Sequence, residues 1–331
     1  MGLSRFVVGH DLIIQRLERQ RAEGRIAHAY LFTGPPQVGR RTLAWTWGMA
    51  LLCADPDPPC GSCRSCRLMQ ASHHPDAIQV LPEGSSLKID QVREVQRLLA
   101  HTPVEGPYRI VLFDQAETMT TEAANALLKT LEEPPSYGVL MLIAPSPESL
   151  LPTVVSRCQI LSLDPIPIPR VRQALEERWG IPPDQADRLA RLSGGRMGWA
   201  VQAAQDPEVL AEYADRIRQI HELLTQGRAG RFAFAEALSG EEEGVRSAFL
   251  ETAMAWWRDV LILASGADLP LTHEEDRSTL QEVARRIGVE GARAALEATR
   301  RAWLALRRNA NVRLALEAMF LDWPAPMREN P

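Results

Sequence analysis

The segment Gly34–Thr42, which reads GPPQVGRRT, constrains the possible folds of this 331-residue chain most strongly. It follows the apolar run Ala29–Phe32, and its spacing of glycine, four residues and glycine is typical of a phosphate-binding loop between a strand and a helix. In such a loop, backbone amides and the N-terminus of the next helix bind anionic oxygens. The segment therefore predicts a strand, a loop and a helix, and the alternation of strands with helices in the first half of the chain predicts a parallel sheet covered by helices on both faces.

The same segment lacks the side chains that a hydrolytic phosphate loop requires. Arg40 and Arg41 stand where Lys and then Ser or Thr would neutralise phosphates and hold magnesium. Arg40 keeps the charge but has a larger, planar head group, and Thr42 comes one position late. We therefore predict an altered loop that neither hydrolyses ATP with magnesium nor binds nucleotide passively. Its candidate residues are Gly34, Gly39, Arg40, Arg41 and Thr42; the alternative is a tight turn with a solvated arginine pair.

A second apolar run, Arg109–Phe113, ends in Asp114 and Gln115. Hydrolases with a phosphate loop hold magnesium with an acid at the end of such a strand, and a following glutamate orients the attacking water. An amide is a poor base, and general-base assistance is worth about 10²–10⁴-fold in rate. Alone, the run fits an ordinary buried strand that ends in a turn. Together with the altered loop, it indicates a nucleotide-binding fold without catalysis.

Apolar runs alternate with amphipathic segments over the first half of the chain. Strands are expected at 29–32, 76–81, 108–113, 139–143 and 160–163, and helices at 7–25, 42–52, 89–100 and 121–132. After the prolines at 165, 167 and 169, every apolar pattern has helical spacing, with helices expected at 171–179, 183–192, 199–205 and 312–321. We predict an α/β domain (1–165), a small three-helix lid domain (166–208) and a helical C-terminal domain for oligomerisation (209–331).

Composition agrees with a folded, water-soluble chain. Apolar residues make up 45% and charged residues 24%, and no apolar run approaches the length of a membrane span. We expect a cytoplasmic protein without membrane contact. The formal net charge of −5 gives no general reason to expect nucleic-acid binding.

Four of the five cysteines fall within fourteen positions, in the pattern C-x6-C-x2-C-x2-C. In a reducing compartment such a cluster favours a metal site over disulfides. Four thiolates suit a structural, tetrahedral zinc ion, and zinc would stabilise a Pro- and Gly-rich segment that cannot form its own core. The predicted ligands are Cys53, Cys60, Cys63 and Cys66. His73 and His74 are alternative ligands if Cys53 is not one, and surface thiols without metal are the other interpretation.

Several motifs together resemble the AAA+ clamp-loader subunits of bacterial DNA polymerase III. They are Val8-Gly9-His10, Arg25–Phe32 (RIAHAYLF), the cysteine cluster, Asn125–Pro135 (NALLKTLEEPP) and Ser156-Arg157-Cys158. The resemblance covers residues 1 to about 208 and continues more weakly through 309–311 (NAN). In this family the gamma/tau ATPases keep an intact phosphate loop, whereas the delta-prime type commonly has an altered one. Arg40, Arg41 and Gln115 resemble the delta-prime pattern.

The resemblance implies a RecA-like AAA+ sheet domain with a zinc module at 53–66, and a circular collar formed by the C-terminal helices. It implies a heteropentamer with three gamma/tau ATPase subunits and one delta subunit. It also implies that Arg157, otherwise a plain surface charge, enters the ATP site of the neighbouring ATPase as an arginine finger. The chain would be a non-hydrolysing stator of the DNA polymerase III holoenzyme that supports loading of the sliding clamp onto primed DNA, with indirect or weak contact to clamp and DNA.

Another position departs from the ATPase pattern. The family's ATPases carry a nucleotide-sensing arginine on the small helical domain. Here Arg196 lies nearby, but Gly198 occupies the matching position.

Two other functions remain as alternatives. An active gamma/tau-like ATPase would need Arg40 to act as the phosphate lysine and another acid, such as Glu117, to position water. A free-standing zinc-bearing DNA-binding module is disfavoured by the net charge of −5.

Overall fold

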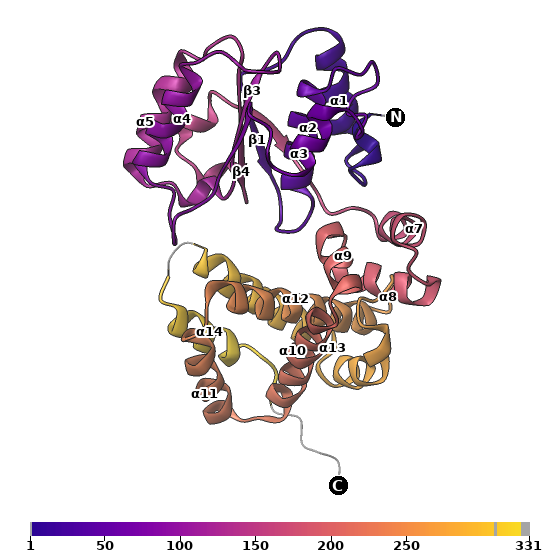
Figure 1. Ribbon diagram of the computed structural model, residues 1–331. Coiled ribbons are helices and arrows are strands. Elements are labelled where there is room, and N and C mark those ends of the chain that lie inside the picture. The colour runs from indigo at the N-terminus through magenta and orange to yellow at the C-terminus, as the bar shows by residue number, and fades with distance from the viewer. Residues whose placement is uncertain (1, 308–309, 326–331) are drawn as a thin grey trace. The chain divides into compact units, whose positions relative to one another are not determined.

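Five short strands form one parallel sheet in the computed structural model, which describes residues 2–307 and 310–325 (Figure 1). The pairing of β1 with β4 and β5 is parallel, so each connection must cross over the sheet. Each strand lies at one of the predicted apolar runs. In sheet order they are β2 (Ala77–Val80), β3 (Arg109–Phe113), β4 (Gly138–Ala144), β1 (Ala29–Thr33) and β5 (Gln159–Ser162).

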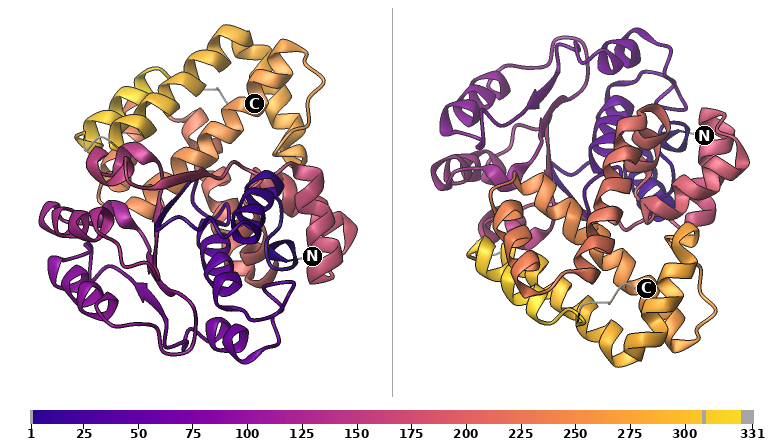
Figure 2. Two further views of the ribbon diagram at one scale, coloured as in Figure 1. Left: turned by 90° about the horizontal axis from the view of Figure 1, so that it is seen from above. Right: turned by 90° about the horizontal axis from the view of Figure 1, so that it is seen from below.

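Helices cover both faces of this sheet (Figure 1, Figure 2). Successive strand residues point to opposite faces. Tyr30 and Phe32 therefore pack on one side, and Leu31 and Val111 on the other. The first side is covered by α1 (Asp11–Ala22), α2 (Arg40–Leu52) and α3 (Arg64–Gln70), and the second by α4 (Ile89–Leu99), α5 (Thr121–Glu132) and α6 (Pro152–Val155). Short 3₁₀ turns are η1 (Leu3–Arg5), η2 (Ala116–Thr118) and η3 (Pro147–Ser149).

Two local predictions were wrong in detail. The helix predicted at 7–25 is shorter, because His10 (φ 57°) and Gly24 (φ 66°) have left-handed backbones on either side of α1. The segment 53–66 was not among the predicted helices because it is rich in Pro, Gly and Cys, but α3 begins at Arg64. There the Cys63 side chain accepts a hydrogen bond from the Cys66 N–H and caps the helix.

The described chain divides into two compact units, Met1–Val201 and Gln202–Pro331. The first contains the sheet together with α7 (Ile168–Trp179), α8 (Pro183–Ser193) and the start of α9 (Met197–Gln205). These helices are those predicted for the lid. The proposed domain boundaries at 165 and 208 remain a prediction.

The second unit is helical and has an aromatic core. Trp257 packs edge-on against both Trp256 and Trp323. The buried Arg231 donates to the backbone carbonyls of Leu223 and Pro324. These bonds connect the end of the helix at 207–225 to the segment after the helix at 312–321. The elements are α10 (Pro207–Thr225), α11 (Arg228–Ser239), α12 (Glu243–Ser265), η4 (Glu274–Asp276), α13 (Arg277–Leu306, bent at Gly288) and α14 (Val312–Leu321). Asn309 of the predicted motif and residues 326–331 of the predicted collar lie outside the described residues.

Candidate functional site

The loop between β1 and α2 has a backbone shape that depends on its glycines. Gly34 has a φ of 139°, and a Cβ there would lie 2.2 Å from the carbonyl oxygen of Leu163, so only glycine fits. Gly39 has a φ of 111° and is the N-cap of α2, which begins at Arg40. The amides at the start of this 13-residue helix therefore adjoin the loop, as in loops that bind anionic oxygens. Arg40 is half-buried and Thr42 is exposed.

Arg41 lies beside Asp114, the acid that follows β3. The Arg41 Nη1 atom is 3.5 Å from Asp114 Oδ2, and Arg41 Nη2 donates to Gln79 Oε1 at 2.6 Å. The Asp114 side chain is 15% exposed and that of Arg41 is 55% exposed. Screening by solvent therefore limits the contribution of this ion pair to the stability of the fold to about 1 kcal/mol. The carboxylate thus has a counter-ion from the protein itself, at the place where a magnesium site would need a hydroxyl ligand.

Gln115 has a conformation unlike that of an ordinary strand residue. Its φ and ψ are 52° and 50°, and its N–H donates to Asp114 Oδ1 at 3.0 Å. The residue is exposed. A side-chain amide in this place can orient a water molecule but cannot accept its proton as a carboxylate would.

Hydrogen bonds from two other segments of the chain hold residues 37 and 38 of the loop. The His10 Nε2 atom lies 3.1 Å from the carbonyl oxygen of Val38, and burial lowers the pKa of His10. Gly198, in the first turn of α9, donates its N–H to the carbonyl oxygen of Gln37 at 2.8 Å. A Cβ on Gly198 would lie 2.8 Å from that same oxygen, so the contact requires glycine. The helix that carries Gly198 is therefore bonded directly to the loop.

The segment before Gly198 is also fixed. The Ile166 N–H donates to the Gly195 carbonyl oxygen at 2.9 Å, and a Cβ on Gly195 would lie 2.4 Å from the oxygen of Ile166. Arg196 donates through Nε to the carbonyl of Ser193 at the end of α8.

The four predicted cysteine ligands converge on one point. Their sulfur atoms all lie within 4.8 Å of one another, and the Cys53–Cys60, Cys53–Cys63 and Cys60–Cys66 distances are 3.7, 3.8 and 3.9 Å. Tetrahedral zinc with Zn–S bonds of about 2.3 Å separates its sulfurs by about 3.8 Å. Backbone N–H groups of Cys63 and Ser62 lower the pKa of Cys60 to about 6, which favours its thiolate, whereas burial raises the pKa of Cys53 and of Cys66, so a bound cation would be needed to ionise those two thiols. The cluster fits a structural metal ion such as zinc.

His74 is not needed as a ligand. Its Nε2 lies 3.0 Å from Ser65 Oγ on α3, and its Nδ1 accepts the N–H of Asp76 at 3.0 Å. Both ring nitrogens are thus engaged in joining the metal-binding segment to the start of β2. His73 is exposed and is not part of the sulfur cluster.

A buried ion pair beside the metal-binding segment was missed by sequence reasoning. Asp76 accepts from the N–H groups of Val104, Glu105 and Gly106 at 2.6, 2.7 and 3.0 Å, and from Arg109 at 3.3 Å. Burial opposes the ionisation of Asp76, but these donors outweigh it and lower its pKa. The signal in the sequence was a charged residue at the start of each of two apolar strands.

Arg157 lies on the surface between α6 and β5. Its Nη2 donates to Glu132 Oε1 at 2.7 Å and its Nη1 to the Thr153 carbonyl at 2.9 Å. Ser162, five residues further on, pairs with Thr33, which precedes the loop. Arg157 precedes β5, the loop follows β1 and the two strands are parallel, so Arg157 and the loop of its own chain lie at opposite ends of these strands. Burial raises the pKa of the adjacent Cys158 thiol to about 12, which makes it a poor nucleophile.

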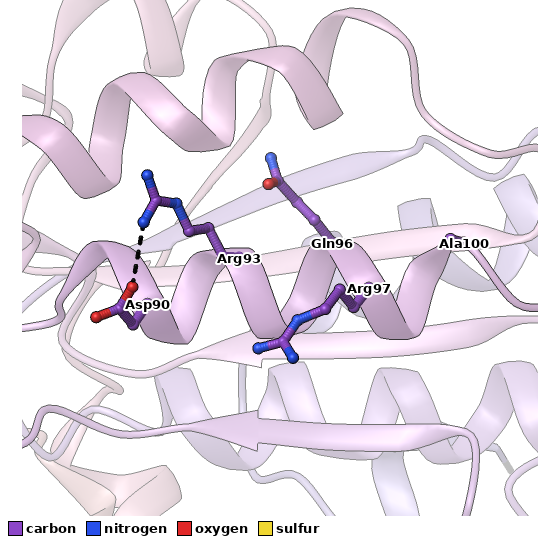
Figure 3. Close-up of a pocket in the computed structure, with 5 residues that line it drawn as sticks. All are labelled: Asp90, Arg93, Gln96, Arg97 and Ala100. Atoms are coloured by element: carbon purple, nitrogen blue, oxygen red, sulfur yellow. Dashed lines mark hydrogen bonds and ion pairs between the residues drawn. The ribbon is translucent and has the colours of Figure 1, made fainter.

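A hollow on the surface of α4 lies apart from these groups (Figure 3). Its lining includes Asp90 and Arg93, which form a 3.3 Å ion pair, together with Gln96, Arg97 and Ala100. None of these side chains belongs to the loop, the cysteine cluster or the surroundings of Arg157. We therefore do not assign the hollow to the candidate site.

Comparison with known proteins places this geometry in a family. Residues 9–167 match the family described as DNA polymerase III, delta subunit. DNA polymerase III subunit delta' of Pseudomonas aeruginosa is 33% identical over 315 residues, which cover 90% of this chain and 92% of the relative. The chain belongs to the delta-prime family. The corresponding subunit of Bacillus subtilis is 29% identical, over 93% of this chain and 94% of its own length.

The structure of this delta-prime chain confirms the predicted parallel-sheet domain followed by helical regions. The tau subunit of DNA polymerase III from Escherichia coli is 31% identical over 198 residues, which is 58% of this delta-prime chain but 31% of tau. In the described part of the chain, no helix is both long and apolar enough to cross a membrane.

Proposed function

We propose that this delta-prime chain is a non-hydrolysing subunit of the replicative clamp loader. It supports ATP-dependent loading of the sliding clamp onto primed DNA, and it supplies Arg157 to the ATP site of a neighbouring gamma/tau ATPase subunit. The observation that carries the proposal is the pairing of Arg41 with Asp114. The residues at the two positions that would together hold magnesium instead form an ion pair with each other.

The proposed lack of ATP hydrolysis follows from three differences from the ATPase pattern, at positions 40, 41 and 115. The loop lacks the lysine ammonium, because Arg40 presents a wider, planar group. It lacks the hydroxyl that would coordinate magnesium, and Gln115 replaces the carboxylate that would activate water. The missing base alone is worth about 10²–10⁴-fold in rate, so turnover by the chain itself is expected to be negligible.

The position of Arg157 supports a role in another subunit. Arg157 precedes β5, at the end of the sheet opposite the loop of its own chain, and its side chain is 35% exposed and accessible to a neighbour. An arginine delivered across an interface stabilises charge on the transferring phosphoryl group and is worth about 10³-fold or more. This role requires no nucleotide on the chain that supplies the arginine.

The remaining parts have structural roles in this proposal. The four cysteines would hold one zinc ion, which shapes the segment 53–70 without an open position for chemistry. The lid (166–208) and the collar (209–331) would place the chain beside gamma/tau and delta subunits. Contacts with clamp and primer-template DNA would be indirect or weak.

Two measurements test the proposal. The purified chain should show no ATP turnover above background; turnover that Arg40→Ala abolishes would instead identify an active gamma/tau-like ATPase. In the complex assembled with gamma/tau and delta subunits, Arg157→Ala should lower ATP hydrolysis about 10³-fold at the one site that it serves, and should lower the rate of clamp loading, while the chain stays folded. Unchanged rates would show that Arg157 is only a surface charge.

A further inference from the structure

The guanidinium of Arg157 is held by more than one group. Nη1 donates to the Thr153 carbonyl at 2.9 Å and to Ser156 Oγ at 3.2 Å, both from its own turn of chain. Nη2 donates to Glu132 Oε1 at 2.7 Å. The first two contacts fix one end of the group, and the contact with Glu132 fixes its rotation about that end.

Glu132 is itself held at a defined place. It is the last residue of α5, which Pro134 and Pro135 prevent from continuing, and the Glu133 N–H donates to the Lys129 carbonyl at 3.1 Å. The start of α5 is fixed as well, since the Thr120 side chain accepts from the Ala123 N–H. The carboxylate therefore projects from the end of a regular helix packed on the sheet.

The placement of this carboxylate is unfavourable on local grounds. The C-terminus of a helix carries a partial negative charge, so adjacent acids at 132 and 133 are disfavoured there. Residues that break a local preference are expected at functional positions. A basic partner offsets the charge of Glu132, and within the described residues its ion-pair partner is Arg157.

We propose that Glu132 is a positioning residue for Arg157: it presents the guanidinium in one orientation to the ATP site of the neighbouring subunit. This inference rests on the proposed function, in which Arg157 acts in trans. Glu132 touches neither nucleotide nor phosphate in this role. By holding Arg157, Glu132 restricts the rotation of the guanidinium before it meets the transferring phosphoryl group. Less conformational entropy is then lost when Arg157 binds that group.

The restricted rotation of the Arg157 side chain sets the size of the expected effect on ATP hydrolysis. Ordering one long, flexible side chain changes an equilibrium about two- to tenfold. The ion pair is exposed, with side chains that are 35% and 51% accessible, so its loss should hardly change the stability of the fold. A catalytic effect of Glu132→Ala would therefore appear without unfolding.

The experiment compares variants of this chain in the complex with gamma/tau and delta subunits, with steady-state ATP hydrolysis as the measurement. The part of kcat that depends on Arg157 is the difference between the unsubstituted complex and Arg157→Ala. Glu132→Ala should lower this part about two- to tenfold, with the KM for ATP unchanged. Glu132→Gln, which keeps an acceptor oxygen, should retain more activity than Glu132→Ala. The matched control is Glu133→Ala, which removes the same charge from the adjacent exposed residue and should leave kcat unchanged.

Two further variants separate this inference from the proposed function. If Arg157→Ala lowers kcat strongly, adding Glu132→Ala to it should cause no further loss, because the two residues act together. An unchanged or increased kcat for Glu132→Ala, beside a strong effect of Arg157→Ala, would overturn the positioning role alone. No effect of Arg157→Ala would overturn both, and equal effects at Glu132 and Glu133 would show a general charge effect and overturn the positioning role.

Discussion

Substitution of Gly198 by alanine should loosen the contact between α9 and the phosphate loop. The added Cβ would lie 2.8 Å from the Gln37 oxygen, well inside the ordinary contact range that begins at 3.4 Å. A shift of that size stretches the hydrogen bond beyond about 3.2 Å and costs about 1 kcal/mol. Relief of the overlap costs about 1–3 kcal/mol, whereas alanine gains about 1 kcal/mol in helix propensity. The net loss is about 1–3 kcal/mol.

Hydrogen–deuterium exchange on the isolated chain measures this loss directly. Amides in the segments 34–39 and 195–200 should exchange about 5- to 150-fold faster in Gly198→Ala, since opening of the contact becomes that much more frequent. Gly244→Ala is the control, because Gly244 lies in the first turn of α12 and a Cβ there meets nothing within 4 Å. Exchange in both segments that equals that of the unsubstituted chain would refute the reasoning.

Three other outcomes are expected. Asp76→Asn should cost about 3–5 kcal/mol in urea denaturation at neutral pH, because it leaves the 6%-exposed Arg109 without its carboxylate. Since the folded pKa of Asp76 is lowered, its contribution is complete above about pH 4 and disappears as the pH falls further, so a variant that loses no stability at pH 7 would contradict the pair. Elemental analysis should find one zinc per chain and none after Cys63→Ser, with a lower Tm; full zinc in the variant would exclude Cys63 as a ligand. Arg41→Thr should change the free energy of unfolding by at most about 1 kcal/mol and restore no ATP turnover, because Gln115 remains; measurable turnover would show that the amide is not limiting.

Elements with strong local signals could be predicted from the sequence. The helix at 121–132 was predicted with its observed bounds, since Thr120 caps its start and Pro134 follows its end. The central strands β3, β4 and β1 were found because each is an apolar run that is buried on both faces of the sheet, whereas the edge strands β2 and β5 are only partly buried. The left-handed backbone of His10, which delays α1, has no comparable signal in a single sequence.

The candidate site could be predicted as a set of residues but not as a set of contacts. The cysteine ligands were found because they are close in the chain. The pairs Arg41–Asp114 and Glu132–Arg157 join residues 73 and 25 positions apart, and neither partner indicates the other by its type or spacing. Gly198 was noted as a missing arginine, whereas its backbone contact with the loop depends on how the helices after β5 fold back.

The arginine at position 41 has a consequence for how readily such a chain could acquire ATPase activity in evolution. Arg41 removes a magnesium ligand and at the same time gives Asp114 its positive neighbour. Restoring a hydroxyl at this position would leave a largely buried acid without a counter-ion until metal and triphosphate arrived, while the changes at 40 and 115 would still prevent turnover. On the proposed function, each single change toward the ATPase pattern is therefore without benefit, so selection has no reason to keep the intermediates between this sequence and an ATPase.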